Sequence, residues 1–148
     1  MLVQQAAWRD IPPETAYEVL ALRVAVFVVE QSCAYLELDG RDLEPTARHL
    51  WIELDGQVAA YLRVLEEGDG AHRIGRVVTR AQARQRGLAE TLILAAQREA
   101  TSAMVLDAQS HLAAWYRRFG FERSGADFVE DGIPHTPMRW PAPTPLGR

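Results

Sequence analysis

The sequence contains only one cysteine, Cys33, in 148 residues. A single cysteine excludes a framework of internal disulfides, so a folded chain must rely on its hydrophobic core. Cys33 and the four histidines are scattered, and none follows a metal-ligand spacing such as H-E-x-x-H or paired C-x-x-C. We therefore expect neither a disulfide-rich protein nor one that binds a metal.

Long hydrophobic runs are also missing. No apolar stretch approaches the ~20 residues that a helix needs to cross a bilayer. Residues 1–10 lack a basic segment followed by an apolar one, which is the pattern of a signal peptide. These absences predict a cytoplasmic protein with no membrane partner.

An excess of basic residues is absent too, because the net charge is −4. General affinity for nucleic acid needs a basic footprint, so we expect no nucleic-acid partner. The arginines instead concentrate between Arg73 and Arg86. A local basic patch on an acidic chain suits a small anionic ligand better than a polymer.

The length and the hydrophobic content of 48% fit one domain with a substantial core. We expect this domain to span residues 1–140. Residues 141–148 contain three of the eight prolines and are expected to form a disordered tail.

The first part of the chain predicts a short strand over residues 2–8, then a helix from Glu14, then an acidic loop over residues 31–46. Apolar side chains recur every three or four positions along that helix and should face the core. They are Tyr17, Leu20, Ala21, Val24, Phe27 and Val28.

Three strands are expected after the loop, over residues 49–54, 57–65 and 73–78. Asp55-Gly56 joins the first two, and this dipeptide favours a tight hairpin turn. The pattern therefore predicts an antiparallel meander.

A helix over residues 90–99 and a strand over 103–107 come next. A second helical stripe contains Leu112, Trp115, Tyr116 and Phe119, and Gly120 ends it. The segments 121–128 and 134–140 could then close the sheet as a hairpin.

The turn between the strand at 73–78 and the following helix has the features of an anion site. The first amides of a helix lack partners within the helix and can bind phosphate. Gly87 has no Cβ, so a phosphate can approach the backbone, and Arg84 and Arg86 add positive charge. A glycine and two arginines also occur in ordinary exposed turns, so this signal needs support from the rest of the chain.

That support comes from a resemblance to the GNAT superfamily of acetyl-CoA-dependent N-acetyltransferases. Its signature after the fourth strand, R/Q-x-x-G-x-G/A, is matched by Arg84-Gln85-Arg86-Gly87-Leu88-Ala89. An aromatic pair ahead of Gly-Phe is matched by Trp115-Tyr116-Arg117-Arg118-Phe119-Gly120-Phe121. Within the superfamily, the chain resembles the ElaA-like group through residues 26–31, 39–42, 48–49, 75–78, 108–112 and 130–135.

The resemblance implies an α/β (α+β) fold, with a mixed, mostly antiparallel central sheet of about six to seven strands flanked by about four helices. It also implies transfer of an acetyl group from acetyl-CoA to a primary amine of a small-molecule or peptidic acceptor. No metal takes part in such a reaction.

The residues that the resemblance assigns to acetyl-CoA are Val77, Val78, Arg84, Gln85, Arg86, Gly87, Leu88, Ala89 and Gln109. The backbone amides of residues 86–89 would hold the pyrophosphate, with help from the side chains of Arg84 and Gln85. The backbone of Val77 and Val78 would pair with the pantetheine arm, and one of their amides could donate to the thioester oxygen.

Tyr116 occupies the family's general-acid position. A phenol with a pKa near 10 can protonate the departing thiolate as it forms. Tyr116 also lies on the apolar stripe of its helix, so a buried structural tyrosine is the alternative reading.

The base that deprotonates the amine is not evident. Many relatives place a glutamate on the fourth strand, but residues 73–78 contain no carboxylate. His49 and His135 are candidates because the ordinary pKa of histidine suits a base. A surface or loop-capping histidine is the alternative for each.

Two acidic loops suggest how the acceptor is attracted. Glu37, Asp39 and Asp42 lie in the first loop, and Glu130 and Asp131 lie in the second. Negative walls would steer a cationic amine, and Glu37, Asp39, Asp42 and Glu130 are further candidates for the base. The alternative is two solvated loops.

Arg23 and Arg76 would each be costly to bury unpaired, and Glu30 is the expected partner. We expect direct attack in a ternary complex rather than an acyl-enzyme at Cys33, because no base is placed beside that thiol. A non-catalytic acyl-CoA sensor or interaction module is the alternative function. A monomer and a homodimer both fit the sequence.

Overall fold

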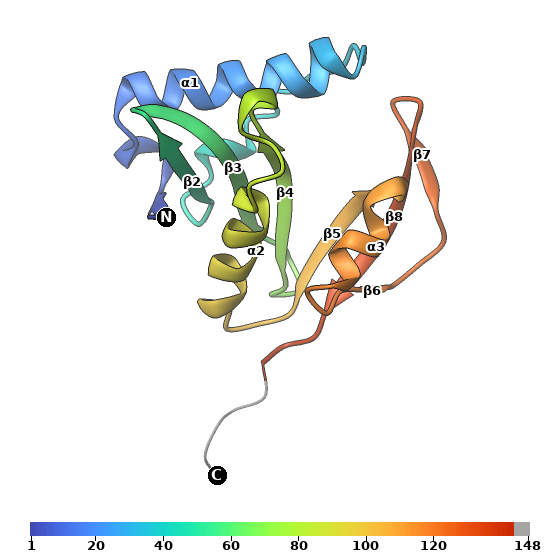
Figure 1. Ribbon diagram of the computed structural model, residues 1–148. Coiled ribbons are helices and arrows are strands. Elements are labelled where there is room, and N and C mark those ends of the chain that lie inside the picture. The colour runs from blue at the N-terminus through green and yellow to red at the C-terminus, as the bar shows by residue number, and fades with distance from the viewer. Residues whose placement is uncertain (144–148) are drawn as a thin grey trace.

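The computed structural model describes residues 1–143. In that part of the chain, eight strands form one sheet in the order β1-β2-β3-β4-β5-β8-β6, and β7 pairs with β8 (Figure 1). The β4–β5 pairing is parallel, and the other pairings among these residues are antiparallel. The predicted mixed, mostly antiparallel fold is confirmed, although the strands are more numerous and the α-helices of residues 1–143 fewer than expected.

The first half of the sheet is the predicted antiparallel meander. Its elements are β1 (Gln4–Ala6), η1 (Trp8–Asp10), α1 (Pro13–Val24), the π-helix η2 (Ala25–Glu30), η3 (Arg41–Leu43), β2 (Arg48–Leu54), β3 (Gln57–Glu66) and β4 (His72–Thr79). Asp55 and Gly56, between β2 and β3, have φ values of 53° and 76°. Positive φ at both positions is the geometry of a tight hairpin turn, so that prediction is confirmed.

Helix α1 buries a different face from the one predicted. Tyr17 is 76% exposed and Val24 is 36% exposed, whereas Val19 and Leu22 lie in the core. Both stripes are apolar and helically spaced, so periodicity cannot rank them. The stripe that packs is the one that places Arg23, 0% exposed, beneath the helix and beside its carboxylate partners.

The second half of the chain completes the sheet. Its elements are η4 (Ala81–Ala83), α2 (Leu88–Arg98), β5 (Met104–Gln109), η5 (Ser110–Leu112), α3 (Ala113–Arg117), β6 (Glu122–Arg123), β7 (Phe128–Glu130) and β8 (Ile133–Trp140). In the described residues, no helix is both long enough and apolar enough to cross a membrane. Of the expected tail, residues 141–143 form neither helix nor strand, and residues 144–148 lie outside the described residues.

The single strand predicted over residues 121–128 is wrong, because two short strands, β6 and β7, occupy this region. Between them, the Ser124 amide donates to the Pro137 carbonyl at 2.9 Å. The amide and the carbonyl of a strand residue face the same neighbour, so Pro137 offers that neighbour no donor. The ladder on this side of β8 is therefore interrupted at Pro137.

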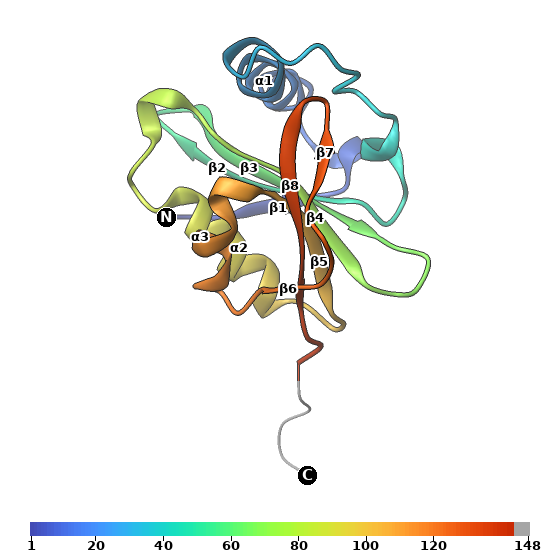
Figure 2. The ribbon, with the colours of Figure 1, turned by 90° about the vertical axis from the view of Figure 1, so that its right-hand side faces the viewer.

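The α-helices divide between the two faces of the sheet (Figure 2). Leu92 of α2 and Tyr116 of α3 belong to the larger core cluster on one face. Val19 of α1 packs with Trp51 and Tyr61 on the other face. Helices α1 and α2 each contact β4, but neither covers the whole length of the region where β4 and β5 lie side by side (Figure 1).

Candidate active site

A cleft of about 470 Å³ opens where β4 and β5 separate. These strands pair only at His72 with Met104 and at Arg73 with Val105. Beyond Arg73, the edge of β4 that faces β5 has no strand partner in the described part of the chain (Figure 1). An unpaired strand edge beside a cavity can bind an extended ligand through backbone hydrogen bonds.

Strand β4 contains a bulge beside this cleft. Its register with β3 shifts so that Arg76 and Val77 together oppose Leu62. Arg76 has a φ of 54° within the bulge. Val77 lines the cleft, whereas the side chain of Val78 is buried against α1.

Tyr116 reaches the cleft from α3. It is 6% exposed, and its ring packs edge-on against Trp115 and Phe121. Burial raises the pKa of the Tyr116 hydroxyl, because a phenolate would be poorly solvated there. Burial is the cause of this shift, and no hydrogen bond from the Tyr116 hydroxyl to the described residues contributes to it. Tyr116 is therefore both a core residue and a cleft residue.

His135 and Gln109 face each other on β8 and β5, and both line the cleft. His135 Nδ1 lies 2.8 Å from the Ile133 carbonyl, which assigns the proton to Nδ1 and the lone pair to Nε2. The His135 ring stacks on Phe128, with centroids 5.6 Å apart. Gln109 Nε2 donates to Gln31 Oε1 at 3.2 Å. The bond to the Ile133 carbonyl thus leaves Nε2 as the ring nitrogen of His135 that can exchange a proton.

His49 does not line the cleft and is 0% exposed. Its Nε2 donates to the Asp42 carbonyl at 3.1 Å, so Nδ1 accepts from the Tyr61 hydroxyl at 2.6 Å. Burial lowers the pKa of His49 and favours the neutral ring. The proposal of His49 as the base is wrong, because the side chain at this strand position points into the core, where both ring nitrogens have partners.

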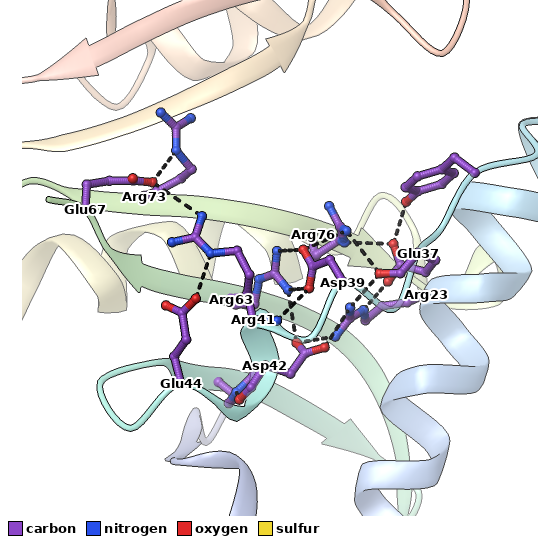
Figure 3. Close-up of polar contacts among 12 residues, drawn as sticks. Arg23, Glu37, Asp39, Arg41, Asp42, Glu44, Arg63, Glu67, Arg73 and Arg76 are labelled. Atoms are coloured by element: carbon purple, nitrogen blue, oxygen red, sulfur yellow. Dashed lines mark hydrogen bonds and ion pairs between the residues drawn. The ribbon is translucent and has the colours of Figure 1, made fainter.

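The acidic segment after α1 is bound to arginines from other elements (Figure 3). Arg23 of α1 forms ion pairs with Glu37 and with Asp42, and its Nη1 lies 2.7 Å from Asp42 Oδ1. Arg63 of β3 donates from two nitrogens to the two oxygens of Asp39, both at 2.9 Å. Arg63 also reaches Asp42 at 3.2 Å. Each carboxylate therefore has a buried guanidinium beside it.

The bulge residue Arg76 adds a third guanidinium to this network. It lies 2.7 Å from Glu37 Oε2 and 3.2 Å from Asp39 Oδ2. Burial opposes ionisation of Asp39, but the hydrogen bonds from Arg63 and from the Arg41 amide, together with the charges of Arg63 and Arg76, outweigh it and lower its pKa to about 2. Three positive side chains thus balance three negative ones.

The predicted negative wall is wrong for Glu37 and Asp42. These residues are 3% and 6% exposed and lie outside the cleft lining, because the arginines draw them into the interior. Asp39 does line the cleft, although it is paired. Glu130 also lines the cleft and has no ion-pair partner in residues 1–143. Asp131 lines the cleft as well and has no ion pair in that part of the chain, so Glu130 and Asp131 are the uncompensated carboxylates of the predicted set.

The glycine turn lies at the start of α2. Gly87 is the N-cap, with φ 73° and ψ 20°, and no side chain caps the helix there. A Cβ at Gly87 would meet no heavy atom within 4 Å, so the space above the turn is open. Gln85, Arg86 and Gly87 are exposed, and Gln85 is also left-handed, with φ 65°. An anion can therefore reach the first amides of α2.

Glu30 pairs with Arg84, not with Arg23 or Arg76 as predicted. One Arg84 nitrogen, Nη2, donates to both Glu30 oxygens, at 3.0 Å and 2.9 Å. The prediction fails because Glu30 closes the π-helix at its exposed end, away from the buried arginines.

Several charged cleft residues were missed by sequence reasoning. Arg73 of β4 and Asp107 of β5 line the cleft and pair at 3.1 Å. The two-residue period of a strand places Asp107 on the same face as Gln109, and this signal could have identified it. Arg63 and Tyr35 line the cleft as well. No local pattern marks Arg63, because it lies within an apolar run.

The mixed, mostly antiparallel sheet with helices on both faces is the acyl-CoA N-acyltransferase fold. A solved acyl-CoA N-acyltransferase from Pseudomonas aeruginosa superposes with a TM-score of 0.86 at 40% identity, covering 95% of this chain and 99% of that one. Residues 13–142 match the family model described as “Acetyltransferase (GNAT) domain”. The chain belongs to this family and is an acyltransferase.

Comparison with individual relatives places the chain in one group within this family. UPF0039 protein Rv2851c of Mycobacterium tuberculosis is 47% identical over 138 residues, which cover 90% of this chain and 88% of the relative. The crystal structure of Escherichia coli ElaA superposes with a TM-score of 0.83 at 32% identity, covering 94% of this chain and 98% of that one. The predicted place of this chain in the ElaA-like group is confirmed.

Proposed function

We propose that the protein transfers an acetyl group from acetyl-CoA to a primary amine of a small-molecule or peptidic acceptor. Both substrates are bound together, and the amine attacks the thioester directly. The observation that carries this proposal is the parting of β4 from β5 with the Tyr116 side chain in the gap. A cytoplasmic location and a monomeric or homodimeric state stay predictions.

The residues of the glycine turn fit a pyrophosphate. The amides of Arg86, Gly87, Leu88 and Ala89 stand at an uncapped, exposed helix N-terminus, where the helix dipole adds about half a positive charge. Arg86 and Gln85 are exposed beside them, and Arg84 is within reach once it leaves Glu30. This end of α2 is therefore the proposed site for the phosphates of the coenzyme.

The unpaired edge of β4 supports the second contact. Along the edge of β4 that faces β5, which has no strand partner beyond Arg73 in residues 1–143, the backbone of Val77 and Val78 can pair with the amides of a pantetheine arm. The amide of Val77 or Val78 can donate to the thioester oxygen as negative charge develops there. Gln109 closes the opposite side of the cleft on β5 and is the proposed polar contact to the arm.

Protons move in two places. The Tyr116 hydroxyl gives its proton to the departing thiolate, and the raised pKa keeps that proton in place at neutral pH. His135 Nε2 takes the proton that the attacking amine loses. Glu130, which has no ion-pair partner among the described residues, draws the cationic form of the acceptor toward the cleft.

The competing proposal is a sensor that binds acyl-CoA without turnover. The observation that favours it is the absence of a carboxylate on β4, where the bulge carries Arg76 instead. Thiol release from acetyl-CoA across a panel of amines separates the two, together with calorimetric titration of coenzyme A. We expect release that depends on the amine and that falls about 100-fold in Tyr116→Phe while coenzyme A still binds. Binding of coenzyme A without release of its thiol would support the sensor. A protein that does not bind coenzyme A would refute both proposals.

A further inference from the structure

Arg76 has an unusual backbone for its place in the fold. Its φ of 54° lies in the left-handed region, which residues other than glycine adopt at a cost. Among residues 1–143, the other non-glycine residues with positive φ lie in turns or loops and are Ser32, Asp55, Gln85 and Asp131. Arg76 has this conformation inside β4. Such a residue persists only where its surroundings hold it.

The Arg76 side chain shows what holds it. Its Nε lies 2.7 Å from Glu37 Oε2, and its Nη2 donates to the Glu37 carbonyl at 3.0 Å and to Asp39 Oδ2 at 3.2 Å. The guanidinium carbon lies 5.7 Å from the centroid of the Tyr35 ring. The side chain is 20% exposed, and Figure 3 shows it beside Glu37 and Asp39. The Arg76 side chain therefore contacts several residues of the segment that follows α1.

That segment is anchored without Arg76. Glu37 also pairs with Arg23, and Asp39 is held by two hydrogen bonds from Arg63. Both carboxylates would thus keep a cationic partner if the Arg76 side chain were removed. The position of the segment therefore does not depend on Arg76. The conformation of Arg76, and with it the bulge, depends on the segment.

We propose that Arg76 is a positioning residue for acyl transfer. Its ion pairs with Glu37 and Asp39 hold the bulge of β4 in its left-handed conformation, and the bulge aims the backbone of Val77 into the gap. The proposal rests on the proposed function, because the direction of this backbone matters only if a thioester binds there. In this proposal, the segment that contains Glu37 and Asp39 holds the part of β4 that would contact the thioester.

The register of β4 has a separate support. Val78 is 4% exposed and packs with Tyr61 in the cluster beneath α1. A register slip would move Val78 to the other face, so it is strongly disfavoured. Loss of the Arg76 side chain should therefore loosen the bulge without unfolding the sheet.

Two substitutions separate backbone positioning from direct contact with substrate. Arg76→Ala removes the ion pairs and keeps a Cβ that disfavours φ 54°, whereas Arg76→Gly removes the same pairs from a residue that adopts this φ freely. Arg80→Ala, just after β4, is the matched control, because Arg80 bonds Gln57 and lies outside the network. The readouts are kcat, KM for the amine, affinity for coenzyme A, and hydrogen exchange of peptides over residues 35–42 and 74–79.

We expect Arg76→Ala to lower kcat by about 10- to 100-fold, with a smaller loss of affinity for coenzyme A, because the proposed phosphate contacts at α2 lie outside the bulge. Exchange should quicken over residues 74–79 but not over 35–42, and Arg76→Gly should recover most of kcat. Equal kcat losses in both variants, with a raised KM for the amine, would mean that the guanidinium itself contacts the acceptor and would overturn the proposal. Wild-type kcat or unchanged exchange in Arg76→Ala would also overturn it. If the wild-type protein acylates no amine, the proposed function is refuted. Hydrogen exchange in Arg76→Ala would still test whether the ion pairs of Arg76 hold the bulge.

Discussion

Glu30 accepts both of its hydrogen bonds to Arg84 from one nitrogen, Nη2, at 3.0 Å and 2.9 Å. Arg84 Nε also donates to the Thr79 carbonyl at 3.2 Å. The arginine that the sequence assigns to the pyrophosphate is thus tied to the end of the π-helix. The two side chains are 41% and 46% exposed, so water screens the pair and an anion can compete for Arg84.

Glu30→Gln should therefore tighten the binding of coenzyme A. Without the carboxylate, Arg84 is free to meet the phosphates, and we expect the Kd to fall about two- to threefold at low salt. Arg84→Gln should raise the Kd instead. Isothermal titration of both variants measures this, and equal Kd values in the wild type and both variants would place the pair away from the coenzyme.

Gly87→Ala should weaken the binding of coenzyme A by about tenfold or more, because Gly87 has φ 73° and a Cβ there obstructs the approach of a phosphate. Gly56→Ala is a matched control, since Gly56 has φ 76° and equally open surroundings in the β2–β3 turn. Both variants should lose about 1 kcal/mol of unfolding free energy. A Kd that rises in neither variant, or in both, would contradict a phosphate site at α2.

His135→Asn should lower kcat about 100-fold near neutral pH. The loss should shrink as the pH approaches about 10, because an alkyl ammonium with a pKa near 10.4 then loses its proton without a base. His111→Asn is the control, because His111 is exposed in η5. A loss that stays constant with pH would assign His135 to packing on Phe128 rather than to proton transfer.

Asp42→Asn should destabilise the fold by about 3 kcal/mol, because it leaves buried Arg23 without one of its two carboxylates. Arg63 loses a contact as well. Urea denaturation at neutral pH measures the change, with the exposed Glu122→Gln as control. A change within about 0.5 kcal/mol would show that the charge of Asp42 is dispensable to the network.

Acid should weaken the fold over a defined range. The pKa of Asp39 falls from 3.8 to about 2 on folding, so its ion pairs stabilise the protein above pH 3.8 and are lost as the pH falls through about 2. The pKa of Asp42 is lowered as well, because the hydrogen bonds and charges of Arg23 and Arg63 together outweigh the effect of burial. Unfolding free energy should decline between about pH 4 and pH 2, and Asp39→Asn should flatten that decline. An identical slope in Asp39→Asn would refute the assignment.

Local signals in the sequence predicted the parts of the site that depend on neighbouring residues. Asp55-Gly56 predicted a hairpin with two positive φ values, and both are present. The same reasoning located Gly87 at the cap of α2. For α1, by contrast, periodicity offered two apolar stripes, and Tyr17 shows that the predicted one faces solvent.

The sequence by itself determined the family, the mixed sheet and the glycine turn, since turn chemistry, capping and hydrophobic period act between residues close along the chain. Only the tertiary structure decided that the acidic segment is neutral as a whole and that His49 is buried. The pairs that produce this result join Arg23 to Asp42, Arg63 to Asp39 and Arg76 to Glu37, across 19, 24 and 39 positions. Charges separated this far along the chain meet only when packing brings them together, and no local pattern encodes which carboxylate each arginine reaches.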